Sequence, residues 1–194
     1  MDALTPEGIA ALLAALPSMP PAEQEELLAD LDELARRKEV DLAINSFLAF
    51  CHRVYPGFKE GPHHRNMAKY LEAVCFGAEN RVTVSMPPRF GKSETISYLF
   101  VAWYLGHHPT HHIMMVTHTA DLSADFGRKV RNLIGSEAYR EIFTETVVAS
   151  DKSAANNWAT TLGGKYLAIG VGANAAGHGA DLLIADDLVS EQAV

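Results

Sequence analysis

A short segment near the middle of the chain, SMPPRFGKSE at residues 85–94, restricts the possible folds more than any other feature. Its second half matches the end of the phosphate-binding loop G-x-x-x-x-G-K-[ST], although Met86 stands where that pattern has its first glycine. The β-branched run RVTVSM precedes the segment and predicts a strand. A helix is predicted after it, because apolar residues recur at the i, i+3, i+4, i+7 spacing, namely Ile96, Leu99, Phe100 and Trp103. Strand, loop and helix in this order favour a nucleotide site over a chance GKS on a surface turn.

The loop supplies most of the groups that bind phosphate. A phosphate site needs inward N–H groups at a helix N-terminus, a lysine for the outer phosphates and a hydroxyl for Mg²⁺. Pro87 and Pro88 have no N–H, so the cradle must be built from Arg89 onward, and Arg89 can act as a built-in arginine finger. The predicted catalytic residues here are Arg89 and Lys92, and the predicted ATP-binding residues are Arg89, Phe90, Gly91, Lys92, Ser93 and Glu94.

A second motif, DLLIADD at residues 181–187, complements the loop. Its apolar run 182–185 is typical of a strand covered on both faces. It ends in Asp186, predicted to hold Mg²⁺ together with Ser93, and Asp187, predicted to polarise the attacking water; Glu191 is a weaker candidate for that role. The alternative is a strand that ends in a solvated acidic turn.

The remaining pattern predicts an α/β fold, with a parallel sheet between helices. HHIMMVTHT reads as a strand, ADLSADFGRKVRNLI as an amphipathic helix, and WATTLGGKYLAIGVG as two strands joined through Gly163 and Gly164, followed by the glycine-rich GVGANAAGHGAD. Upstream, DLAINSFLAFCHRVY and HHRNMAKYLEAVC each predict one helix. Three basic residues fall off the apolar face of the amphipathic helix, and they either contact DNA or a neighbouring subunit's ATP or form a solvated face: Arg128, Lys129 and Arg131.

The acidity of the chain is confined to one end. Residues 1–41 hold ten acidic and three basic residues, whereas residues 42–194 hold fourteen and thirteen, so most of the net charge of -8 lies in the first part. We predict an acidic helical arm over residues 1–45 and an ATPase domain over residues 46–194. The arm is predicted to be a helical hairpin, which is either a docking element for a partner subunit or a solvated helix packed on the domain.

Composition excludes several classes of protein. Among the 194 residues, 48% are hydrophobic, enough for a core, but no apolar run approaches the roughly 20 residues of a membrane span. Asp2 and Glu7 stand where a signal peptide would be basic, which predicts a cytoplasmic protein. Cys51 and Cys75 read as buried reduced thiols. The tract HHPTHH at 107–112 is a weak metal candidate, and His63–His64 lie either near an adenine or on a surface turn.

Several motifs together, PPRFGKSE, AWYLGHHP, DFGRKVRNLI, NNWATTLGGKYLAIGVG and GHGADLLIADDLVSEQ, resemble the ATPase domain of the large terminase subunit of tailed bacteriophages. The resemblance runs from about Phe47 to the C-terminus. It implies a phosphate-loop NTPase fold of the ASCE type and an enzyme that hydrolyses ATP with Mg²⁺ to move double-stranded DNA into a capsid. It also implies a homo-oligomeric ring that works with a portal protein and a small terminase subunit in the host cytoplasm, docked on the procapsid.

Two departures limit this resemblance. Many members have Glu after the magnesium-binding acid, where this chain has Asp187. The family also continues into further ATPase strands and a nuclease domain that nothing here matches, so the sequence predicts a C-terminally truncated, poorly active or inactive ATPase portion. The alternative functions are a small-molecule phosphotransferase such as a nucleotide kinase, and a noncatalytic interaction module that keeps the nucleotide fold.

Overall fold

The computed structural model describes residues 5–173 and 177–189. The chain divides into two units, one through Asp41 and one from Leu42 onward. The first contains α1 (Pro6–Ala15), the 3₁₀ turn η1 (Leu16–Ser18) and most of α2 (Pro21–Asn45). No helix within the described residues is both long and apolar enough to cross a membrane.

Local signals define the ends of the first helices. The Thr5 hydroxyl accepts a hydrogen bond from the Gly8 N–H at 3.1 Å, which caps α1. Pro21 occupies the first position of α2, where its missing N–H is not needed. On α2, hydrogen bonds from Arg36 and then Arg37 lower the pKa of the exposed Glu33 to about 2.

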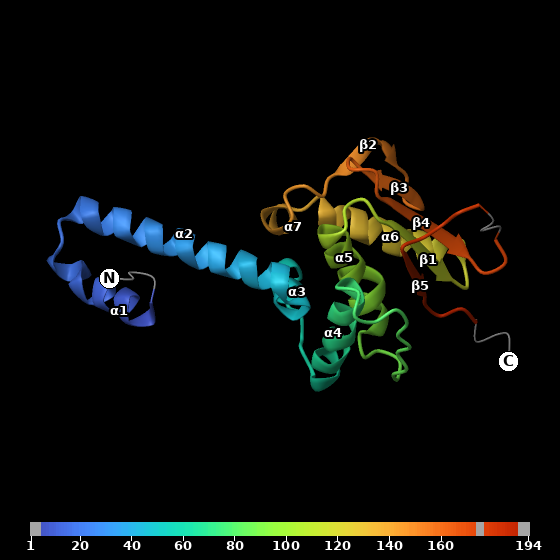
Figure 1. Cartoon of the computed structure of the whole chain (residues 1–194), viewed down its shortest axis with the longest axis horizontal. Coiled ribbons are helices and arrows are strands. Elements are labelled where there is room, and N and C mark those ends of the chain that lie inside the picture. Colours follow the sequence, from blue (N-terminus) through green and yellow to red (C-terminus); the bar gives the residue numbers. More distant parts are fainter. Residues whose placement is uncertain (1–4, 174–176, 190–194) are drawn as a thin grey trace. The chain divides into compact units, whose positions relative to one another are not determined.

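The second unit holds the other helices and the whole sheet (Figure 1). Its helical elements are α3 (Phe47–Val54), α4 (Pro62–Cys75), the π-helical segment η2 (Glu94–Phe100), α5 (Val101–His107), α6 (Ala120–Ile134) and α7 (Glu137–Ile142). Its strands are β1 (His112–Thr117), β2 (Val148–Ser153), β3 (Asn157–Thr160), β4 (Lys165–Gly170) and β5 (Leu182–Ala185).

The single helix predicted over residues 41–55 is wrong, since the chain breaks at Ser46. The Ser46 hydroxyl caps α3 at the Ala49 N–H, and the Phe47 N–H donates to the Glu72 carboxylate at 2.8 Å. The break is therefore stabilised by a side chain from α4. By contrast, α4 and α6 lie where the sequence predicts them.

The sheet is mixed, not wholly parallel as predicted. Its order is β2-β3-β4-β1-β5, with β1 parallel to both β4 and β5, while β2 and β3 add antiparallel strands at the other side. The predicted strands β1, β3, β4 and β5 are confirmed, and β2 was not predicted. The strand β5 is not covered on both faces, because it is an edge strand whose Leu183 is 60% exposed.

The segment before the loop is also not a strand of this sheet. Residues 81–86 have no regular secondary structure, and Val82, Val84 and Met86 are half-buried in alternation with exposed residues. Within the described chain, their main-chain groups make no hydrogen bond. The alternation expected from the sequence is therefore present without a pairing strand.

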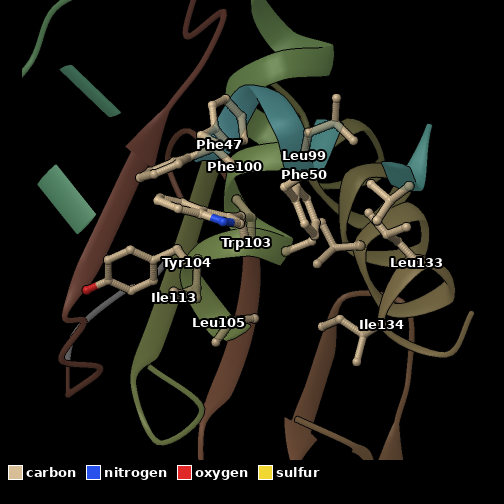
Figure 2. Close-up of a cluster of buried hydrophobic side chains, with 14 of the residues drawn as sticks. Phe47, Phe50, Leu99, Phe100, Trp103, Tyr104, Leu105, Ile113, Leu133 and Ile134 are labelled. Carbon is tan, nitrogen blue, oxygen red and sulfur yellow. The ribbon is translucent and has the colours of Figure 1, made fainter. Parts of the chain in front are cut away.

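The core of the second unit surrounds the helix that follows the loop. Figure 2 shows Trp103 packed among Phe47, Phe100 and neighbouring apolar side chains. The ring centroids of Phe47 and Trp103 lie 5.6 Å apart, and the indole N–H of Trp103 donates to the Ala43 carbonyl at 3.0 Å. The predicted apolar helix face is confirmed, although its first turns, η2, are π-helical and not α-helical.

Both cysteines are buried free thiols, as predicted. Burial raises the pKa of Cys75 to about 12 and raises that of Cys51 further. Neither thiol is therefore ionised near neutral pH.

Candidate functional site

The loop between residue 86 and η2 contains two residues with positive φ angles, Arg89 and Gly91. Gly91 has φ of 80°, which glycine adopts without strain, and its carbonyl accepts from the Thr95 N–H at 2.9 Å. Arg89 also has a positive φ of 67°, which is unusual for a residue with a Cβ. Strained backbone of this kind concentrates at functional sites.

The end of the loop and the end of β5 meet at one point. The Lys92 ammonium lies 2.8 Å from Oδ1 of Asp186, and the Ser97 hydroxyl donates to Oδ2 at 2.9 Å. Ser93 also lies close enough to the Asp186 carboxylate to lower its pKa. The structure thus brings together three of the residues singled out in the sequence, namely Lys92, Ser93 and Asp186.

The Asp186 carboxylate is only 7% exposed yet stays ionised. Burial by itself raises its pKa, but the neighbouring Lys92, Ser93 and Ser97 side chains more than offset this effect, so the pKa lies below its ordinary value. Because each of these partners is a donor, the site holds a carboxylate and not a carboxylic acid. A charged carboxylate at the end of a strand is a ready ligand for a cation.

The chemistry of this donor set fits Mg²⁺. A carboxylate and two hydroxyl oxygens are hard ligands, and Mg²⁺ in proteins is usually held by one or two carboxylates while it keeps several waters. Asp186 and Ser93 would hold it. Within the described residues, this cluster included, no group of three or more histidines, cysteines or carboxylates could hold a metal ion.

Two predicted catalytic residues are not drawn into this cluster. The Arg89 side chain is exposed and has no partner within the described residues. Asp187 is exposed at a positive φ of 50°, and its backbone carbonyl accepts from the His118 N–H at 3.0 Å. Glu191 lies outside the described residues, as does the middle of the predicted glycine-rich loop.

The basic residues of α6 have partners. Arg128 pairs with Asp125 at 3.0 Å on the same helix, and Lys129 pairs with Glu94 at the start of η2 at 2.9 Å. Arg131 lies on the same helix and is half-buried. The Lys129 contact places α6 directly beside the end of the loop.

The histidine tract at residues 107–112 is structural. His107 donates to the Ile44 carbonyl at 3.0 Å, and His108 donates to the Cys75 carbonyl at 2.8 Å. His111 is hydrogen-bonded to the Tyr104 hydroxyl at 2.9 Å. The hydrogen bonds of His107 and His108 connect neighbouring helices, so a structural role explains the histidine tract without a metal.

His63 and His64 lie beside the loop, not on a surface turn. The His64 side chain is 7% exposed, and its Nε2 lies 3.1 Å from where a Cβ on Gly91 would be. The ring of His63 meets that of Phe90 edge-on at 5.6 Å. The start of α4 therefore forms one wall of the loop.

A large groove opens next to the cluster. It has a volume of about 980 Å³, and its lining includes Val82, Val84 and Leu182–Asp186. Lys92 also lines it. The groove thus adjoins both the segment before the loop and the edge strand β5.

A comparison with known protein families identifies the family of the chain. A family model described as terminase large subunit, T4likevirus-type, N-terminal, matches residues 84–192, more than half of the chain. The chain belongs to this terminase family. The match begins in the segment before the loop and continues past the Asp186 strand, so it includes every residue of the terminase cluster around Lys92. No curated protein and no solved structure gives a significant match.

Sequence reasoning missed Ser97 in the terminase site. Its side chain is fully buried in a helix otherwise rich in apolar residues, and it lies four residues after Ser93, so both can face Asp186. A buried hydroxyl within an apolar helix was the available signal. Its contact with Asp186 exists only because folding brings the end of β5 to η2.

We expect Ser97→Ala to destabilise the folded terminase chain by about 1–3 kcal/mol at pH 7, because a buried carboxylate loses a donor. The same loss should raise the pKa of Asp186. A carboxyl group whose pKa is lower in the folded than in the unfolded protein stabilises the fold at pH values above its unfolded-state pKa. That stabilisation is lost as the pH falls from the unfolded-state pKa through the folded-state pKa. The difference between wild type and variant should therefore be constant above the ordinary carboxyl pKa of 3.8 and narrow below it.

Urea unfolding at several pH values measures this difference. Thr95→Ser is the matched control, because Thr95 is equally buried in η2 and makes no contact with Asp186. A Ser97→Ala penalty that is independent of pH down to acid unfolding would contradict the assignment.

Proposed function

We propose that this chain is the ATP-hydrolysing part of a terminase motor that drives double-stranded DNA into a bacteriophage capsid. Family membership supports the packaging role. The observation that supports nucleotide chemistry is the 2.8 Å contact between Lys92 and Asp186, which joins the loop to the acidic strand end. These are the two groups that a phosphate-loop enzyme uses for phosphates and Mg²⁺.

The side chains of this cluster suggest how ATP is bound. In the structure Lys92 neutralises Asp186. When phosphate enters, the Lys92 ammonium can turn to its oxygens, and the Asp186 carboxylate becomes available to a cation while Ser97 keeps it oriented. Bound Mg²⁺ would supply positive charge that neutralises developing charge on the phosphates. The N–H groups from Arg89 to Glu94 and the start of η2 form the rest of the cradle.

Two further residues act at the transition state in this proposal. Arg89 is exposed and unpaired within the described residues, so its guanidinium is available to reach a terminal phosphate. Asp187 follows the cation-binding acid and is proposed to polarise the attacking water. Its backbone is held by the hydrogen bond from the His118 N–H, and its exposed side chain is accessible to water, as this role requires.

The finer fold assignment is a phosphate-loop NTPase of the ASCE type. In this proposal a further strand occupies the groove and pairs with residues 81–86 on one side and β5 on the other. The apolar walls, the unpaired main chain of 81–86 and the exposed Leu183 support it. A polypeptide that carries the family's following segment should then bind Mg²⁺-ATP more tightly than residues 1–194.

The proposed partners follow from the family. They are double-stranded DNA, a portal protein, a small terminase subunit and further copies of the chain in a ring. Contacts of Arg128, Lys129 and Arg131 with DNA phosphates or a neighbouring ATP remain a prediction. DNA would have to compete with Asp125 and Glu94 for the first two side chains.

The deciding experiment is ATP hydrolysis with and without duplex DNA, measured on this chain and on the extended polypeptide. A motor should be stimulated by DNA, whereas a nucleotide kinase should respond to an acceptor nucleotide and a noncatalytic module to neither. If the extended polypeptide hydrolyses no ATP in the presence of DNA, the proposed function is wrong.

We expect Arg89→Ala to lower kcat by about 100-fold or more while KM changes only a few-fold, because an arginine finger acts mainly on transition-state charge. Steady-state ATPase kinetics on the extended polypeptide measure both constants. Arg89→Lys is the control, since it keeps the charge without the planar fork and should remain impaired. Equal losses in affinity and turnover would instead assign Arg89 to ground-state binding.

A further inference from the structure

The ring of His64 is held rigidly at the start of α4. Its Nδ1 accepts a hydrogen bond from the Gly61 N–H at 3.0 Å, within the first turn of the helix. The ring packs against Phe58, with centroids 5.1 Å apart, and against His63 at 4.0 Å. Because three contacts fix it, the ring has little freedom to rotate.

This arrangement also sets the tautomer. Since Nδ1 accepts a hydrogen bond from the Gly61 N–H, the ring proton of neutral His64 is on Nε2. Burial lowers the pKa of His64, the neighbouring His63 lowers it further, and Glu60 opposes both, so the ring is neutral at pH 7. Nε2 makes no hydrogen bond within the described residues, and although the residue as a whole is 7% exposed, this atom is not one of the fully buried unpartnered atoms and still reaches solvent.

The free edge of the ring faces the loop. A Cβ on Gly91 would lie 3.1 Å from Nε2 of His64, closer than most real contacts of a Cβ. Gly91 also has φ of 80° and precedes Lys92 directly. The imidazole therefore occupies space that any other residue at position 91 would need, and it limits how far the loop can move toward α4.

We propose that His64 is a positioning residue whose Nε2 edge abuts Gly91 and holds the phosphate loop in place for the proposed nucleotide site. It acts through the loop, on which Lys92 and Ser93 depend for their position. The inference rests on the proposed function only for the identity of the ligand. The close approach of the ring to the Cβ position of Gly91 does not depend on that identity.

Two substitutions separate the two edges of the ring. His64→Asn places an amide oxygen near the position of Nδ1, so it can still accept from the Gly61 N–H, but it leaves nothing at Nε2. His64→Gln can place its amide nitrogen near Nε2 but loses the contact with Gly61. If His64 has only a structural role, the asparagine variant should be closer to wild type in loop protection and ATP affinity. If His64 positions the loop, the glutamine variant should be closer to wild type.

The first readout needs no nucleotide. Trypsin cleaves after Arg89 within the loop, and cleavage at Arg36 and Arg37 in the other unit serves as the internal reference in the same digest. We expect loop cleavage to rise about fivefold in His64→Asn and to stay within about twofold of wild type in His64→Gln, since proteolysis reports the population of open loop. Thermal unfolding of both variants gives their order of stability.

The second readout is Mg²⁺-ATP affinity by calorimetry. We expect it to fall about tenfold in His64→Asn and to recover in His64→Gln, because apparent affinity falls with the fraction of molecules whose loop is in the binding-competent position. Wild-type cleavage in His64→Asn, or losses that follow the order of melting temperatures, would overturn the inference. If wild-type protein binds no ATP, the proposed function fails, while the cleavage rates still decide the role of His64.

Discussion

Replacing Lys92 with alanine is expected to reduce Mg²⁺-ATP affinity by about 100-fold or more, because the phosphates lose their main cationic partner in a partly buried site. Asp186→Ala should have a similar effect through loss of the cation ligand. Both expectations depend on the contact between the Lys92 ammonium and the Asp186 carboxylate, which places the two groups at one point. Calorimetry in the presence and absence of Mg²⁺ measures them.

The two variants should differ in the absence of ligand. Lys92→Ala leaves the buried Asp186 carboxylate without its cation, so the pKa of Asp186 should rise and the fold should be weakened. Asp186→Ala removes the buried charge and leaves Lys92, which is about one-third exposed and can reach water. Unfolding at pH 7 should therefore rank Lys92→Ala as the less stable variant.

A matched control is available beside the loop. Lys129 pairs with Glu94 at 2.9 Å but is half-exposed and does not contact Asp186. Exposed pairs contribute about 0–1 kcal/mol, so in the isolated chain, where Lys129 meets no neighbouring subunit's ATP, Lys129→Ala should change ATP affinity little. Wild-type affinity in Lys92→Ala, or an equal loss in Lys129→Ala, would show that the loop is not a phosphate site.

The elements that the sequence predicts well are those whose signals are local. Helix α6 is found with its bounds because its apolar spacing is regular and Thr119 caps it by accepting from the Leu122 N–H. Strands β1 and β5 are apolar runs between polar turns. In the site, Lys92 and Asp186 are predictable because each follows from a motif at an element's end.

The features that were not predicted depend on contacts between distant residues. The break at Ser46 is stabilised by Glu72 on another helix. The strand β2 has the sequence VASDKS, which lacks apolar alternation and is ordered by pairing with β3. Ser97 and His64 gain their roles only because folding brings them to Asp186 and Gly91.

The mixed directions of the strands in the sheet also depend on how the chain connects them, and not on the pattern within each strand. Periodicity can identify a strand, but the direction of pairing is a property of the connections. The short turn at Gly163 and Gly164 makes β3 and β4 an antiparallel hairpin, with Trp158 opposite Tyr166. The indole N–H of Trp158 donates to the Gly127 carbonyl on α6, which fixes the hairpin against that helix.

The largest effect on stability is expected at Trp103, at the centre of the core behind the loop (Figure 2). Trp103→Ala should lower the free energy of unfolding by about 3–5 kcal/mol, the usual range for removing a buried large aromatic side chain. Trp103→Phe should cost about 1–3 kcal/mol, because it keeps a ring but leaves the buried Ala43 carbonyl without its donor. Urea unfolding followed by circular dichroism measures both.

The control for this prediction is Phe76, whose ring lies 5.6 Å from that of Trp103 but is 58% exposed. Phe76→Ala should cost about 1 kcal/mol or less, since little apolar area is removed from a buried environment. Comparing the losses in unfolding free energy of Trp103→Ala and Phe76→Ala tests whether the buried face of the helix after the loop contributes most of its stability. If Phe76→Ala destabilises the chain as much as Trp103→Ala, then the exposed ring is an essential part of the core, and the groove it lines is not an open surface of the folded protein.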